Sequence, residues 1–147
     1  MALSESPDTA AIVVVDDNPQ NLRLLKSILS REGFEIHLID NAEQAQTTIC
    51  SVVPDLILMD IMMPDIDGFT LCRLLREHDT IKDIPIIFIS ALSDIKDKLE
   101  AFTAGGVDYV TKPFNPHEVL ARVNTHLKLR TMQKELQKKI SSLNKKS

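Results

Sequence analysis

Five short apolar segments, each followed by a polar or charged residue, recur along the chain. They consist mainly of β-branched and aliphatic residues, as do strands that are buried on both faces of a parallel sheet. The segments are Ala11–Val15, Phe34–Ile39, Leu56–Met59, Ile86–Ile89 and Val107–Thr111. We expect all five to be strands.

Between these segments, apolar residues recur every three or four positions, which is the spacing of one face of a helix. Four of the helical segments begin with residue pairs typical of a helix start, in which a side-chain oxygen caps the first turn. These starts are Asn18 with Pro19, Asn41 with Gln44, Asp67 with Gly68, and Asn115 with Pro116 and Glu118.

The helix between the last two strands has a weaker start signal. Ser93 is its expected N-cap, and Ile95, Leu99 and Phe102 follow at helical spacing. Gly105 should end this helix by adopting a left-handed conformation. Strands and helices therefore alternate along the whole chain.

Regular alternation of this kind predicts a doubly wound α/β fold, because each right-handed crossover must lie over a parallel sheet. The 147 residues are enough for one domain with one core.

The last predicted helix is longer than a sheet of this size needs. It contains no Gly or Pro after Pro116, and a helix that ran to Leu143 would be roughly 40 Å long. Apolar residues in its distal part keep roughly a heptad spacing, with Lys139 where an apolar residue is expected and Ile140 beside it. These residues are Leu129, Met132, Leu136 and Leu143.

We therefore divide the chain into a disordered segment at residues 1–10, a globular domain at 11–127 and a helical extension at 128–147. The extension is interpreted as a marginal coiled coil that supports a weak homodimer, or as a linker to an output domain. A solvated helical tail is the alternative.

Charge is distributed unevenly and excludes some functions. The chain has 17 basic and 21 acidic residues, but from Arg122 onward there are eight basic residues and only one acid, Glu135. The acidic main body argues against direct nucleic-acid binding, and a solvated helix face accounts for the basic end. No apolar segment approaches membrane-spanning length, and two cysteines form no disulfide framework. We expect a cytoplasmic protein.

Polar residues follow four of the predicted strands. Because the carboxyl ends of parallel strands meet at one edge of a sheet, these side chains should gather there. They are Asp16, Asp17, Asp60, Ser90 and Lys112. Three carboxylates repel one another, and together with the lysine they carry a charge of -2, which one divalent cation would neutralise. An oxygen-only site of this kind suits Mg²⁺.

The order and spacing of these residues resemble the receiver domain of two-component response regulators over residues 11 to about 127. The matching elements are Asp16 and Asp17, Asp60 with Met63, Pro64, Asp67 and Gly68, Ser90 with Ala91, and the segment Asp108 to Phe114. The resemblance implies a flavodoxin-like fold with five strands in the order 2-1-3-4-5 and five helices, the last of them extended.

The same resemblance implies that Asp60 accepts a phosphoryl group from a phosphohistidine of a sensor histidine kinase or a phosphotransfer protein. Mg²⁺ would be bound directly by Asp17, Asp60 and the backbone carbonyl of Met62, while Asp16 would act mainly through water. The phosphoryl group would then control a partner or an output domain.

Three further roles follow from the resemblance. Ser90 and Tyr109 are similar to the switch pair of the family, in which the hydroxyl moves toward the phosphoryl group and the ring turns inward. Lys112 would contact the phosphoryl oxygens, and its bond to Pro113 would be cis.

Two other functions would require residues that this chain lacks. A Mg²⁺-dependent phosphatase that forms an aspartyl phosphate would need a second Asp two residues after the nucleophile, where this chain has Met62. A flavin-binding protein would need a Ser/Thr- and Gly-rich loop after Val15, which is absent. We therefore expect a signalling switch and not an enzyme that turns over a substrate.

Overall fold

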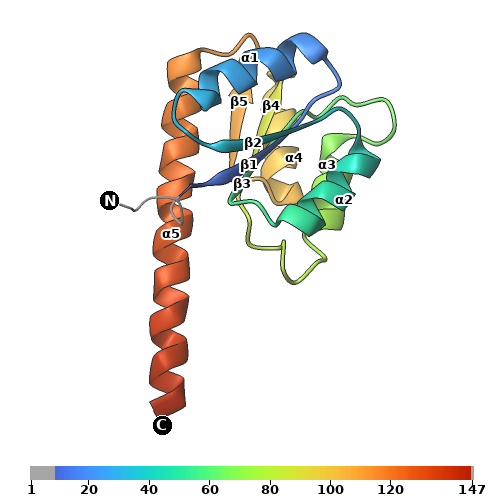
Figure 1. Cartoon of the computed structure of the whole chain (residues 1–147). Coiled ribbons are helices and arrows are strands. Elements are labelled where there is room, and N and C mark those ends of the chain that lie inside the picture. Colours follow the sequence, from blue (N-terminus) through green and yellow to red (C-terminus); the bar gives the residue numbers. More distant parts are fainter. Residues whose placement is uncertain (1–8, 147) are drawn as a thin grey trace.

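The computed structural model describes residues 9–146 and contains one five-stranded parallel sheet with the strand order β2-β1-β3-β4-β5 (Figure 1). The strands are β1 (Ala11–Val15), β2 (Glu35–Ile39), β3 (Leu56–Met59), β4 (Ile86–Ser90) and β5 (Asp108–Thr111). The expected order is confirmed, and strands β2 and β5 begin one residue later than predicted. Apart from Thr9 and Ala10, the segment expected to be disordered lies outside the described residues.

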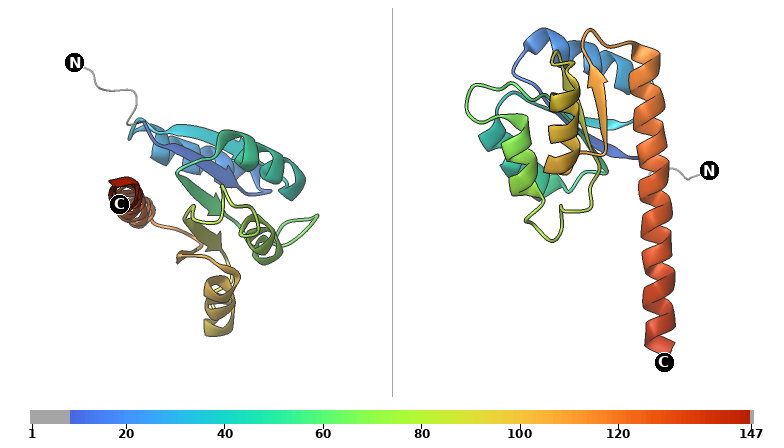
Figure 2. Two further views of the ribbon diagram at one scale, coloured as in Figure 1. Left: turned by 90° about the horizontal axis from the view of Figure 1, so that it is seen from below. Right: turned by 180° about the vertical axis from the view of Figure 1, so that it is seen from behind.

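Five helices alternate with the strands and cover both faces of the sheet (Figure 2). They are α1 (Pro19–Ser30), α2 (Ala42–Val52), α3 (Gly68–Leu75), α4 (Ile95–Ala104) and α5 (Pro116–Lys146). Helices α1 and α5 pack on one face, while α2, α3 and α4 pack on the other. The doubly wound α/β class is therefore confirmed. Among residues 9–146, no helix is long and apolar enough to cross a bilayer.

The predicted caps hold for four helices and fail for α4. The side chains of Asn18, Asn41, Asp67 and Asn115 accept hydrogen bonds from backbone N–H groups of the first helical turn. The N-cap of α4 is Asp94, not Ser93, and the Asp94 side chain makes no capping hydrogen bond. At the other end Gly105 ends α4 with φ 113°, as expected.

The apolar spacing in α4 indicated the helix correctly but does not mark its buried face. Ile95, Leu99 and Phe102 are exposed, and the helix buries only Ala101 and Ala104. Two small side chains form the buried face, and the three large apolar residues lie on the solvent side.

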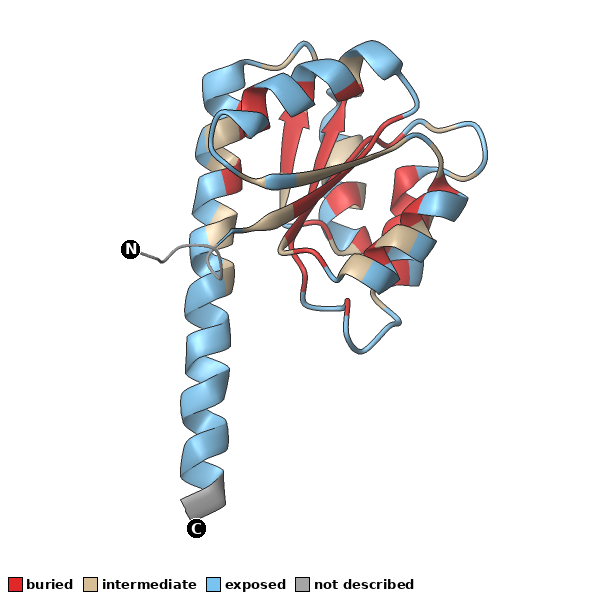
Figure 3. Ribbon diagram, viewed as in Figure 1, coloured by how far each residue is buried: buried red, intermediate tan, exposed pale blue. Residues whose placement is uncertain are grey.

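Strands β1, β3 and β4 form the centre of the core, with almost every side chain buried (Figure 3). Alternate residues along each strand pack into two apolar clusters, one on either face of the sheet. Burial on both faces explains why these strands are continuous apolar runs in the sequence. It also means that a polar residue directly after such a strand lies at the rim of the core.

Helix α5 packs on the sheet only through its first part. Val119 and Val123 are buried and Leu127 is partly buried, whereas residues 131–144 are exposed, and this end of the helix projects from the domain (Figure 1). An ion pair of 3.2 Å between Lys134 Nζ and Asp55 Oδ1 joins the projecting part to the body. The long helix predicted from the lack of Gly and Pro is confirmed.

Candidate functional site

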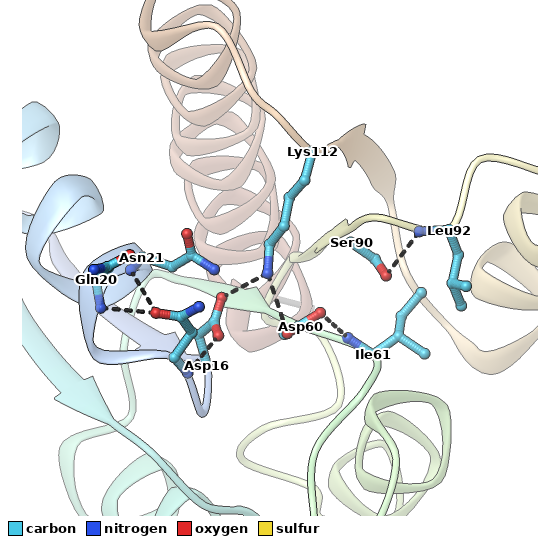
Figure 4. Close-up of polar contacts among 9 residues, drawn as sticks. Asp16, Gln20, Asn21, Asp60, Ile61, Ser90, Leu92 and Lys112 are labelled. Carbon is cyan, nitrogen blue, oxygen red and sulfur yellow. Dashed lines mark hydrogen bonds and ion pairs between the residues drawn. The ribbon is translucent and has the colours of Figure 1, made fainter.

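The five residues predicted to share one edge of the sheet follow the carboxyl ends of neighbouring strands. Asp16 and Asp17 follow β1, Asp60 follows β3, Ser90 ends β4, and Lys112 follows β5. The parallel register aligns Val15 with Met59, and Ser90 with Thr111. Sequence positions almost a hundred residues apart are thereby brought together, as Figure 4 shows for four of these residues.

Three carboxylates form the acidic part of the site. Asp16, Asp17 and Asp60 each offer an oxygen within 4.8 Å of the oxygens of the other two. Asp16 and Asp60 are buried, with 2% and 6% of their surface exposed, whereas Asp17 is exposed. Burial raises the pKa of Asp60, and the neighbouring Asp16 raises it further.

Lys112 lies between the two buried carboxylates. Its Nζ is 3.0 Å from Asp16 Oδ2 and 3.2 Å from Asp60 Oδ2 (Figure 4). Burial alone would lower the pKa of the lysine, but the hydrogen bond and charge of Asp16, together with those of Asp60, raise it. Lys112 therefore stays protonated. The predicted cis peptide bond between Lys112 and Pro113 is present.

One ammonium group does not balance three carboxylates, so the site retains an excess charge of -2 when all three are ionised. The available metal ligands are carboxylate oxygens at the carboxyl edge of the sheet. One of the three acids, Asp17, is exposed to solvent. This donor set fits a hard divalent cation such as Mg²⁺, which prefers oxygen ligands and keeps part of its water shell.

The backbone around Asp60 is fixed by hydrogen bonds and close packing. The N–H of Asp60 donates to the Val15 carbonyl at 2.9 Å, and the N–H of Ile61 donates to Asp60 Oδ1 at 2.8 Å. Gly68, the first residue of α3, packs directly on this backbone, where a Cβ atom would overlap the Asp60 carbonyl oxygen. Only glycine allows α3 to begin this close to the acid.

Met62 follows Asp60 by two residues, and its side chain is 61% exposed at the rim of the site. The loop therefore contains no second carboxylate at the position where an aspartyl-phosphate phosphatase would need one. Coordination of a metal by the Met62 carbonyl stays a prediction.

Ser90 and Tyr109 are linked through the loop after β4. Ser90 is buried, and its Oγ accepts a hydrogen bond of 3.3 Å from the Leu92 N–H. The Tyr109 hydroxyl donates a hydrogen bond of 2.6 Å to the Leu92 carbonyl. The tyrosine ring is already turned inward, with 7% of its surface exposed, and burial raises the pKa of its hydroxyl.

Sequence reasoning missed the part that Leu92 plays in this arrangement. Both groups that it contributes are backbone atoms of a loop, so no residue pattern could have identified them. The five residues predicted for the carboxyl edge of the sheet are all there. Tyr109 lies within β5, and its hydroxyl contacts the loop after β4 and not the carboxylates.

Comparison with known proteins shows which family the whole domain is similar to. Residues 12–124 match the family model described as the response regulator receiver domain. The chain is 40% identical over 130 residues to the transcriptional regulatory protein YvrH of Bacillus subtilis. The alignment covers 87% of this chain and 53% of that protein. It is 38% identical over 117 residues to the DNA-binding dual master transcriptional regulator RpaA of Synechocystis sp., covering 80% of this chain and 48% of that protein. The chain thus spans about half the length of these curated relatives.

Solved structures agree with the observed topology. A response regulator from Chloroflexus aurantiacus superposes with a TM-score of 0.79 at 35% identity, covering 82% of this chain and 98% of that one. A two-component response regulator from Clostridium difficile gives a TM-score of 0.77 at 32% identity, covering 82% and 97%. The projecting end of α5 lies beyond the residues that the family model matches.

Proposed function

The chain belongs to the response regulator receiver family, and on this premise we propose that Asp60 takes a phosphoryl group from the phosphohistidine of a sensor histidine kinase or a phosphotransfer protein. The observation that carries the proposal is the position of Asp60. It is a buried carboxylate at the end of the central strand, in reach of Asp16 and Asp17 and 3.2 Å from Lys112.

The transfer exchanges one bond for another. An oxygen of the Asp60 carboxylate forms a bond to phosphorus while the bond from phosphorus to the histidine nitrogen breaks, and the imidazole leaves. Asp60 Oδ1 is engaged by the Ile61 N–H and Oδ2 by Lys112, so the carboxylate is held in one orientation before the donor arrives. Lys112 can then contact the oxygens of the transferred group and stabilise their charge.

Mg²⁺ is the proposed metal, with Asp17, Asp60 and the Met62 carbonyl as direct ligands and Asp16 acting through water. The excess negative charge of the site and its oxygen-only donors support this assignment. When bound, the ion supplies the positive charge that lets an anionic phosphoryl group approach Asp60.

Ser90 and Tyr109 are proposed as the switch pair. A phosphoryl oxygen that accepts a hydrogen bond from the Ser90 hydroxyl would draw Oγ away from the Leu92 N–H, so the loop that leads into α4 would move. Because the Tyr109 ring is already buried and bonded to the same loop, we expect the modification to hold the ring in this position more firmly.

The proposed role is that of a signalling switch and not of a turnover enzyme, and Met62 at the second position after Asp60 disfavours the phosphatase alternative. We place residues 11–127 in the receiver, and 128–147 in an extension that leads to a partner or an output domain.

We also propose that the protein is located in the cytoplasm. Both cysteines are free thiols, which supports a location in this reducing compartment.

The test uses a small phosphoramidate donor with Mg²⁺, followed by intact-mass measurement. The wild-type chain should gain one phosphoryl group, and Asp60→Asn should gain none. Asp108→Asn, which removes another largely buried carboxylate outside the site, is the matched control and should be labelled like the wild type. Labelling of Asp60→Asn at the wild-type level would refute the assignment.

A further inference from the structure

The projecting part of α5 carries a row of large apolar side chains that nothing in the domain covers. Each is between 50% and 66% exposed, on a helix whose other side chains are mostly charged or polar. The row consists of Leu129, Met132, Leu136, Ile140 and Leu143, and we call it the α5 seam. Exposure of five such residues in one row has a hydrophobic cost unless a second surface covers them.

The seam faces away from the domain. With about 100° of rotation per helical residue, its centre lies roughly 150° around the helix from Val123 and Leu127, which pack on the body. Only the first residue of the seam, Leu129, borders the domain, in a pocket that Arg76 and Val107 also line. From Met132 onward a second helix can lie along the seam. The groove formed by Leu129, Met132 and Leu136 is open on this side.

The spacing of the seam differs from the heptad expected from the sequence. The steps are three, four, four and three residues, so Leu129 repeats at Ile140 and Met132 repeats at Leu143, both eleven residues later. Eleven residues over three turns is close to the natural period of the α-helix, so this row runs nearly straight along the helix. Ile140 belongs to the seam and Lys139 lies at its edge, which removes the apparent break in the heptad.

The same spacing is symmetric about Leu136. The steps are identical in both directions, so a second helix that runs the opposite way meets every apolar layer in register. Leu136 then faces its own copy, Met132 faces Ile140, and Leu129 faces Leu143. A symmetric contact of this kind closes after two copies.

We propose that the α5 seam binds the α5 seam of a second copy of this chain, with the two helices antiparallel and Leu136 at the two-fold axis.

The polar residues at the two edges of the seam select this orientation. Glu135 and Lys139 lie on one edge, and Gln133 and Gln137 lie on the other. In an antiparallel pair each edge faces its own copy, so Glu135 lies two residues along the axis from Lys139 and from Glu135 of the second copy, and the glutamine edges meet each other. Lys139, which lies closer to the seam, supplies the opposite charge. In a parallel pair the charged edge would face the glutamine edge, and neither charge would have a partner of opposite sign.

The contact should be weak. The seam spans fifteen residues, which is about 22 Å of helix, and Lys128, Arg130, Lys134 and Lys138 give the two helices like net charge. A monomer-dimer equilibrium at micromolar or higher concentrations is therefore expected.

Sedimentation equilibrium of the full chain tests whether the seam is the contact. Leu136→Lys should weaken self-association by about tenfold or more, because it places two ammonium groups at the two-fold axis. Ser141→Lys adds the same side chain on the opposite side of the helix and should associate like the wild type. Equal association of the two variants, or no self-association of the wild type at millimolar concentration, overturns the proposal.

Disulfide cross-linking tests the orientation. In a Cys50→Ser background, which removes the exposed native thiol, Met132→Cys and Ile140→Cys are oxidised separately and as an equimolar mixture with copper phenanthroline. The antiparallel pair predicts a cross-linked dimer mainly in the mixture. Efficient cross-linking of each variant with itself, and no gain in the mixture, would show a parallel pair and overturn the proposal.

Charge reversal tests the edge. Glu135→Lys and Lys139→Glu should each associate more weakly than the wild type, since each puts like charges opposite one another. The equimolar mixture should regain association, because every edge contact then joins opposite charges. A mixture no stronger than the weaker variant contradicts the predicted contact between Glu135 and Lys139.

Discussion

Two largely buried aspartates at opposite edges of the sheet have pKa values that their surroundings shift in opposite directions. Asp60 follows β3 at the carboxyl edge, and burial together with the charge of Asp16 raises its pKa. Asp108 begins β5 at the other edge, where burial alone would also raise its pKa. There the hydrogen bonds from Arg122, from the Tyr109 N–H and from His126 outweigh burial and lower it.

The difference lies in the balance of charge. Arg122 Nη1 is 2.7 Å from Asp108 Oδ1, and His126 Nε2 is 3.0 Å from Asp108 Oδ2, so this carboxylate has a partner on each oxygen. At the other edge one lysine is shared between two buried acids, with a third acid nearby. Asp108 is arranged to stabilise the fold, whereas the Asp60 edge keeps a charge excess that a bound cation would neutralise.

The largest effect on stability is expected from Asp108→Asn. The variant leaves Arg122 and His126 without their anionic partner and should lower the free energy of unfolding by about 2 kcal/mol. Urea denaturation at neutral pH measures it. Asp79→Asn, at an acid whose side chain is 97% exposed, is the control and should stay within about 0.5 kcal/mol of the wild type. Similar losses of stability in the two variants would mean that the pairing of Asp108 with Arg122 and His126 does not stabilise the fold.

Mg²⁺ should stabilise the Asp60 edge by a smaller amount. At ten times its dissociation constant, the ion should raise the free energy of unfolding by about 1.4 kcal/mol, because the proposed site is assembled only in the folded chain. Thermal denaturation with Mg²⁺, with EDTA, and with NaCl at matched ionic strength measures the gain. The same gain in a variant with both Asp16→Asn and Asp17→Asn would place the ion elsewhere.

Asp60→Asn should act in the opposite direction from Asp108→Asn. In metal-free buffer it removes the repulsion between two buried acids and leaves Lys112 to pair with Asp16 alone, so stability should rise by about 1 kcal/mol. Urea denaturation in EDTA compares it with the wild type. A loss of stability would show that the pairing of Asp60 with Lys112 outweighs the repulsion.

The smallest effect is the change with pH in the contribution of Asp108 to the free energy of unfolding. Because its pKa is lower in the folded than in the unfolded chain, its contribution is complete above the unfolded pKa of about 3.9 and is lost as pH falls through the folded value. The stability difference between the wild type and Asp108→Asn should therefore be constant near neutral pH and narrow in acid. A stability difference that widens as pH falls would contradict a lowered pKa of Asp108 in the folded chain.

The sequence was sufficient for the strand edge because the fold itself assembles that site. Once the apolar runs are parallel strands, the residues that follow them, such as Asp60 and Lys112, must share an edge. The pattern could not identify the partners of Asp108, since these depend on how α5 is rotated against β5. Arg122 and His126 are four residues apart on that helix and face the same acid only when it is docked.

Helix α4 shows a second limit of the pattern. The spacing of Ile95, Leu99 and Phe102 indicates a helix, but periodicity alone does not tell which face is buried. The contact with the sheet is made by Ala101 and Ala104, whose small side chains let the helix approach closely. The cap failed for a related reason, because Ser93 and Asp94 are both good capping residues and only the path of the loop decides between them.

The length of α5 has a mechanical consequence. Beyond Lys134, whose ion pair with Asp55 is the last contact with the body described above, the helix extends about 18 Å to Lys146. A rigid rod of this length works as a lever arm, so a tilt of about 5° at its anchored end displaces the far end by about 2 Å. A shift at Val119 or Val123 too small to disturb the core packing is thus magnified, at the far end, to a size comparable with the rise of one helical residue.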